Sequence, residues 1–169
     1  MEKRQMNDEC VDGGVLHKFD DAHRIIECTE LTAFHCVFSL LALAEPGMLG
    51  NRVYRLDAVL ENGVVKGQLD WYCCGDGERV PFEAEPSFMD KLQEIVAKYD
   101  LAQHNGFTHT VNGLPDMYGA KLDIRYGSGE SIYAYNNEDC FLPMKMMEES
   151  VELFKVFFEK QRKSITAFY

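Results

Sequence analysis

The chain lacks the signatures of the common nucleotide-binding and catalytic sites. It contains no GxGxxG sequence and no P-loop, which are the usual glycine-rich loops for phosphate groups. A G-x-S-x-G elbow and an HExxH sequence are also absent, so no motif points to a serine hydrolase or a zinc protease. No motif in the sequence indicates a particular reaction. We favour a non-enzymatic protein of unknown function over an enzyme.

Positive charge is scarce. The chain has 17 Lys and Arg against 28 Asp and Glu, which gives a net charge of −11. An acidic chain repels phosphate backbones and anionic lipids, so we expect neither nucleic acid nor a membrane as partner. The most apolar run, residues 37–44, is too short to cross a bilayer, and the first residues include no apolar signal segment. We therefore expect a cytoplasmic protein.

The six cysteines have irregular spacing and form no CxxC pair, so we expect free thiols. The densest group of metal-capable side chains is His23, Cys28, His35 and Cys36. Zinc takes nitrogen and sulfur ligands tetrahedrally. His35 and Cys36 are neighbours, however, and would point to opposite faces of a strand. We expect no metal and no cofactor.

Two units of similar order are present in the chain. In residues 119–163, Leu122, Ile124 and Tyr126 alternate with charged residues, and a Gly-rich turn and a return strand follow. Apolar residues at helical spacing then follow Pro143: Met147, Val151, Phe154 and Phe158. Each of these features predicts part of a ββα unit.

The other unit spans about residues 52–100. An Asn62-Gly63 pair separates two alternating segments, which predicts a tight hairpin. Residues 80–83 favour a brief edge strand, and a helix is predicted from about 86 to 100. Its buried face would be Phe88, Leu92, Ile95, Val96 and Tyr99.

Together the patterns predict one two-layer α+β domain over residues 21–169, preceded by a polar arm at residues 1–20. Residues 31–43 suit a strand or a buried helix, and aromatic and β-branched content favours the strand. We expect an antiparallel sheet of about five or six strands with both helices on one face, as tandem ββα units. Residues 101–118 form a long loop between them.

Part of the chain resembles a known group of proteins. The residues that carry the resemblance are Leu92-x-x-Ile95, Lys98-Tyr99, Asn105-Gly106-Phe107, Leu122-x-Ile124-x-Tyr126-x-x-Gly129-x-x-Ile132 and Pro143 before a final helix. This order is similar to that of a widespread bacterial family of unknown function and covers about residues 54–163. The resemblance implies the same fold and brings no activity.

Two kinds of functional site remain open. Tyr133 and Tyr135 alternate with Ile132 and Ala134, so they should lie on the sheet face away from the helices, as should Tyr72. Exposed tyrosines suit binding of another protein, a second copy of the chain, or a ligand.

The alternative is a small enzyme or small-molecule-binding protein with its site in the loop at residues 103–118. His104, His109 and Asp116 are its catalytic candidates, because a His beside a carboxylate can act as a general base.

Overall fold

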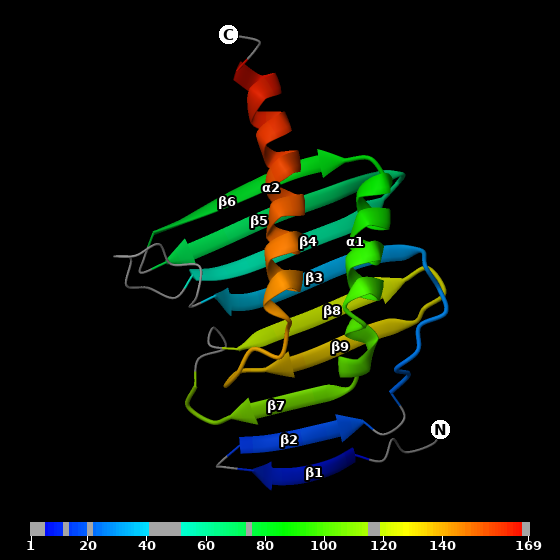
Figure 1. The fold of residues 1–169 in the computed structure, drawn as a ribbon, viewed down its shortest axis with the longest axis vertical. Coiled ribbons are helices and arrows are strands. Elements are labelled where there is room, and N and C mark those ends of the chain that lie inside the picture. The colour runs from blue at the N-terminus through cyan, green and yellow to red at the C-terminus, as the bar shows by residue number, and fades with distance from the viewer. Residues whose placement is uncertain are drawn as a thin grey trace.

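The computed structural model is an α+β fold. It describes residues 6–11, 14–19, 22–40, 52–73, 76–114 and 119–166, with side chains for 15–16, 22–39, 53–72, 77–114 and 119–157. The strands described are β1 (Met6–Val11), β2 (Gly14–Phe19), β3 (Leu31–Leu40), β4 (Arg52–Glu61), β5 (Val64–Cys73), β6 (Asp76–Ala84), β7 (Phe107–Val111), β8 (Ala120–Tyr126) and β9 (Ser131–Asn136). The helices are α1 (Ser87–Lys98), the 3-10 turn η1 (Leu101–His104) and α2 (Met144–Thr166) (Figure 1).

The sheet is larger than predicted and is not purely antiparallel. Its nine described strands run in the order β1-β2-β7-β9-β8-β3-β4-β5-β6, and β7 pairs with β9 in parallel. Each strand predicted from alternation is present, including β3, which confirms a strand rather than a helix within residues 31–43. The additional strands are β1 and β2, in the expected arm at residues 1–20, and β7, in the expected loop. They lie at one end of the sheet, held by pairing with segments distant in sequence.

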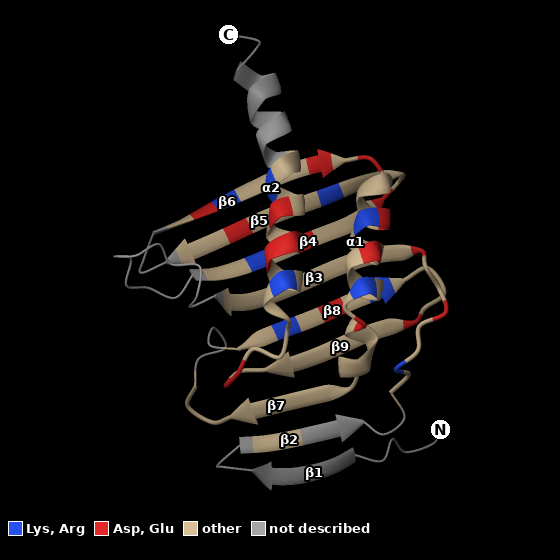
Figure 2. Ribbon diagram, in the orientation of Figure 1, with Lys and Arg blue, Asp and Glu red and all other residues tan. Residues whose placement is uncertain are grey.

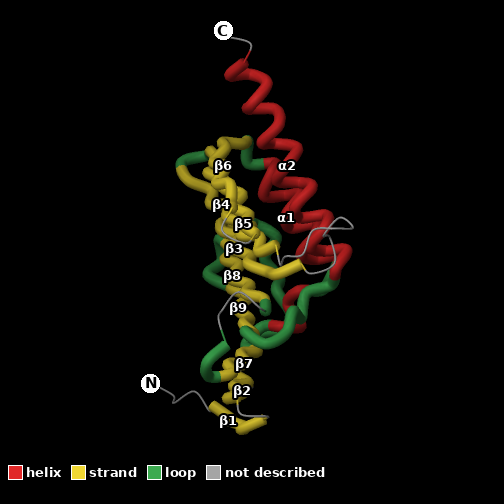
Figure 3. The backbone as a smooth tube through the Cα atoms, turned by 90° about the vertical axis from the view of Figure 1, so that its left-hand side faces the viewer, coloured by secondary structure: helices red, strands yellow, loops and turns green. Residues whose placement is uncertain are grey.

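Both helices lie on the same face of the sheet, as predicted (Figure 3). The described side chains that the periodicity assigned to the core are buried, except for Tyr99, which is partly exposed; the buried ones are Phe88, Leu92, Ile95, Val96, Met147, Val151 and Phe154. The side chain of Phe158 lies outside the described residues. The ring of Phe154 meets the ring of Phe88 edge-on at 5.1 Å between centroids. This apolar layer fixes which sheet face the helices cover.

The tight turns follow the glycine pattern. Asn62 and Gly63 both have positive φ, at 51° and 78°, in the turn between β4 and β5. Gly129 has a φ of 88° in the turn between β8 and β9. These are the left-handed conformations that close hairpins. The turns set the registers that decide which side chains share a face.

Charged residues are unevenly distributed over the strands. Both signs of charge occur on α1, α2 and the strands β4, β5, β6 and β8 (Figure 2). In contrast, β3, β7 and β9 contain no Asp, Glu, Lys or Arg. The uncharged β3 thus lies between the charged strands β4 and β8. None of the described helices combines the length and the apolar character needed to span a bilayer.

Candidate functional site

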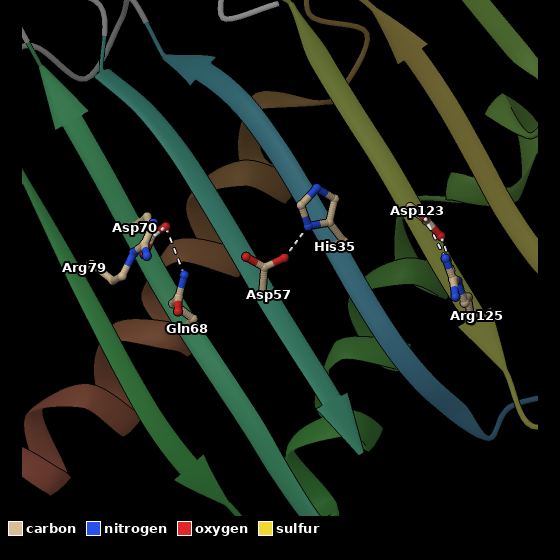
Figure 4. Close-up of polar contacts among 7 residues, drawn as sticks. All are labelled: His35, Asp57, Gln68, Asp70, Arg79, Asp123 and Arg125. Carbon is tan, nitrogen blue, oxygen red and sulfur yellow. Dashed lines mark hydrogen bonds and ion pairs between the residues drawn. The ribbon is translucent and has the colours of Figure 1, made fainter. Parts of the chain in front are cut away.

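The strands present a second face on the side opposite the helices. We call this surface the helix-free face; it carries alternate residues of β3, β4, β5, β8 and β9, among them His35, Arg55, Asp70, Lys121 and Tyr133. Figure 4 shows His35 and Asp70 on this face. In β9, Ile132 and Ala134 are buried under the helices, while Tyr133 and Tyr135 point the other way, with Tyr133 40% exposed. The period of two therefore positions the tyrosines as the sequence predicts.

Tyr133 and Tyr135 belong to one hollow, which we call the tyrosine hollow. It has a volume of about 320 Å³ and is lined by His35, Val37, Arg55, Lys121, Tyr133 and Tyr135. The Nζ atom of Lys121 lies 5.9 Å from the centroid of the Tyr133 ring, within cation–π range. Tyr72 lies on β5, which β8, β3 and β4 separate from β9, so the structure does not bring it to this hollow.

The carboxylates near the tyrosine hollow are already engaged (Figure 4). Asp57 pairs with Nδ1 of His35 across the β3–β4 boundary. Asp123 accepts from the Nε and the Nη2 of Arg125 at 3.3 and 3.4 Å. Each of these two carboxylates therefore contacts a residue other than Arg55 or Lys121.

Asp70, opposite Arg55 in the register, is likewise turned to other groups. It accepts from Nε2 of Gln68 at 3.0 Å and lies 3.4 Å from Nε of Arg79. Within the described part of the chain, Arg55 and Lys121 make no ion pair. The tyrosine hollow thus offers cationic groups without an internal counter-ion.

A second hollow, of about 580 Å³, lies beside the first on β4, β5 and β6. Its charged lining residues are Asp57, Lys66 and Glu83, and Lys66 pairs with Glu83. The two hollows differ in charge, because only the tyrosine hollow is lined by cationic side chains without a carboxylate. Sequence reasoning missed Arg55 and Lys121; strand alternation places each on this face, but only the strand order brings them together.

The structure does not assemble the catalytic candidates of the 103–118 loop. His104 lies in η1 with its ring 5.1 Å from that of Phe141, and burial lowers its pKa. His109 is buried on β7, with Nδ1 3.5 Å from the carboxylate of Glu138. Among the described contacts, no hydrogen bond joins His104 to His109. Asp116 lies outside the described residues.

The metal candidates lie on different sides of the sheet. His35 is on the helix-free face, whereas Cys36 is fully buried under the helices, where burial raises the pKa of its thiol. Cys28 and His23 lie in the segment before β3. Across the described residues, no group of His, Cys, Asp and Glu has the arrangement of a metal site. The argument that His35 and Cys36 point apart is therefore confirmed.

Comparison with known proteins identifies no relative of this chain. The resemblance at residues 54–163 accordingly stays a prediction, and the function must be argued from the geometry alone. No family model, no curated protein and no solved structure matches this chain.

Proposed function

We propose that this chain is a non-enzymatic binding domain whose helix-free face receives another protein or a ligand. The observation that carries the proposal is the position of Tyr133 and Tyr135 on the face opposite both helices, in a hollow with Arg55 and Lys121. Tyr and Arg are enriched at binding surfaces because each combines a large contact area with polar groups that orient the partner.

The described N-terminal residues do not compete for this face. β1 and β2 extend the sheet at its edge, next to β7, and do not fold back over it (Figure 1). The segment before β3 is held at the β8–β9 turn, where Glu130 accepts from the backbone N–H groups of Glu27 and Cys28. These contacts favour a second molecule, and not the N-terminal segment, as the cover of the tyrosines.

The proposal is tested with a double variant, Tyr133→Ser with Tyr135→Ser. Used as bait in affinity capture, the wild-type chain should retain a partner that the double variant loses, because the variant removes the aromatic contact area. Val156→Ser is the control, since Val156 is 51% exposed but lies on α2, on the other side of the sheet.

Sedimentation of the same proteins over a range of concentrations identifies the case in which the partner is a second copy. Self-association that disappears only in the double variant supports the proposal. Equal retention of every captured protein by all variants, together with unchanged sedimentation, would contradict a protein or a second copy as the partner. Thermal melts of each variant establish that the loss reflects the surface and not unfolding.

A further inference from the structure

The tyrosine hollow has a cationic centre built from strands that are not consecutive in sequence. Arg55 on β4 and Lys121 on β8 both stand opposite Val37 of β3 in the strand registers. Adjacent strands lie about 4.8 Å apart, so the two backbones are separated by roughly 10 Å, with Val37 between them. Arg and Lys side chains are long enough to converge over a residue of that size.

The polar groups around this centre leave the cations available. Asp57 and Asp123 are engaged by His35 and Arg125. Asp70, opposite Arg55, uses Oδ2 for Gln68 and Arg79, and its buried Oδ1 has no hydrogen-bond partner, so it forms no ion pair with Arg55. A Lys or Arg that has no carboxylate partner stays strongly attractive to an anion at short range. The whole molecule carries a charge of −11, so a local cationic hollow stands out against the rest of the surface.

We propose that the tyrosine hollow binds a small molecule that carries one carboxylate on an apolar, ring-sized body. The proposal rests on the proposed function, because it takes the helix-free face as the binding surface. The planar guanidinium of Arg55 matches a carboxylate in a bidentate pair, and Lys121 adds a point charge. Tyr133 and Tyr135 supply flat apolar walls and Val37 an apolar floor for the body of the ligand.

The size of the hollow and the charge of the chain favour a small monocarboxylate as the ligand. A volume of about 320 Å³ is at the lower end for small-molecule sites. The net charge of the chain opposes anions more strongly as their charge rises, which favours a monocarboxylate over a phosphate or a polyacid. An acidic protein surface would meet the same long-range repulsion over a larger area, so we assign the cationic centre to a small ligand.

The test is a titration of the full chain, labelled with ¹⁵N, with benzoate, benzamide and inorganic phosphate, followed by two-dimensional NMR. Benzoate should give saturable shifts at the amides of Val37, Lys121 and Tyr133. Benzamide has the same shape without the charge and should give none, and phosphate should bind more weakly than benzoate.

Matched variants locate the site. Arg55→Gln should weaken benzoate binding by about tenfold to a hundredfold, since it removes a charge-assisted contact. Lys66→Gln removes one positive charge from the same face, in the second hollow, and should leave the affinity unchanged. Lys121→Gln gives a second, independent loss, and the spectra of the unliganded variants report whether each one is folded.

The inference is overturned if benzoate gives no saturable shifts, if benzamide or phosphate binds as well as benzoate, or if Arg55→Gln and Lys121→Gln bind like the wild type. The proposed function fails only when the double tyrosine variant keeps every captured protein and its sedimentation and the helix-free face also binds no benzoate. Loss of a protein partner without benzoate binding would remove this inference and leave the proposed function standing.

Discussion

The side chain of Asn105 forms a hydrogen bond with the backbone of Tyr133. Oδ1 of Asn105 accepts the N–H of Tyr133 at 2.8 Å, and the N–H of Gly106 donates to the carbonyl of Tyr133 at 2.9 Å. Nδ2 of Asn105 also donates to the carbonyls of His23 and Ser131, at 2.8 and 2.9 Å. Gly106 has a φ of 80°, which glycine adopts without strain. The Asn-Gly pair therefore fixes the strand that carries the proposed binding residues.

We expect Asn105→Ala to destabilise the fold by about 1–3 kcal/mol, because it removes three side-chain hydrogen bonds to the backbone, each worth about 0.5–1.5 kcal/mol. Urea unfolding measures the change in the free energy of unfolding. Asn112→Ala is the control, since Asn112 is exposed and lies just after β7. Equal stabilities for the two variants would show that the Asn105 contacts contribute nothing measurable.

Phe154 lies at the centre of the contact between helices and sheet. It is fully buried, with its ring 5.1 Å from that of Phe88 and 5.6 Å from that of Phe82. Phe154→Ala should cost about 3–5 kcal/mol, since truncating a buried Phe leaves a cavity. Val156→Ala on the exposed side of the same helix should change the stability by less than about 0.5 kcal/mol. A thermal melt of Phe154→Ala that matches the wild type would contradict this packing.

Acid should release the contact that Glu130 makes. Hydrogen bonds from the Ser128 hydroxyl and from the Glu27 backbone N–H lower the pKa of Glu130 below its ordinary value of 4.5. A carboxyl whose pKa is lower in the folded chain contributes stability above the unfolded value, and that stability is lost as the pH falls through the folded pKa. The difference in unfolding free energy between the wild type and Glu130→Gln should therefore be present at pH 7 and shrink below about pH 4.5.

Urea unfolding at a series of pH values gives that difference. Glu94→Gln, at an exposed position on α1, is the control for removing one negative charge from an acidic chain. A Glu130→Gln difference that stays constant from pH 7 to well below 4.5 would mean that the Glu130 contacts do not favour its charged form.

The described cysteines should react with alkylating agents in a fixed order. The thiolate is the reactive form, and a backbone hydrogen bond from Ser128 lowers the pKa of Cys28. Burial raises the pKa of both Cys140 and Cys36, and Cys36 is the more deeply buried. We expect Cys28 to react first, Cys140 next and Cys36 last.

Iodoacetamide labelling of the native protein, with peptide mapping by mass spectrometry, gives the three rates. Labelling in urea is the control, because unfolding removes the differences in burial. Cys36 reacting as fast as Cys28 in the native protein would place Cys36 outside the core.

For the strands that it predicted, the sequence by itself determined the side of the sheet on which each residue lies. Alternation in β9 assigns Ile132 to the helices and Tyr133 to the opposite face, and helical spacing assigns Phe154 to the core. Such local periods are visible in one segment, because the side-chain direction depends only on the backbone of that segment.

The tertiary structure decided which of these residues meet. β7 joins the sheet through its parallel pairing with β9, and β2 joins through its pairing with β7. The polar, weakly patterned sequences of these segments do not predict either pairing. Arg55 and Lys121 belong to strands distant in sequence and become neighbours of Val37 only because β3 pairs with both β4 and β8. The order and register of non-local strands depend on the packing of the whole chain, and the cationic tyrosine hollow therefore follows from the fold and not from any single stretch of sequence.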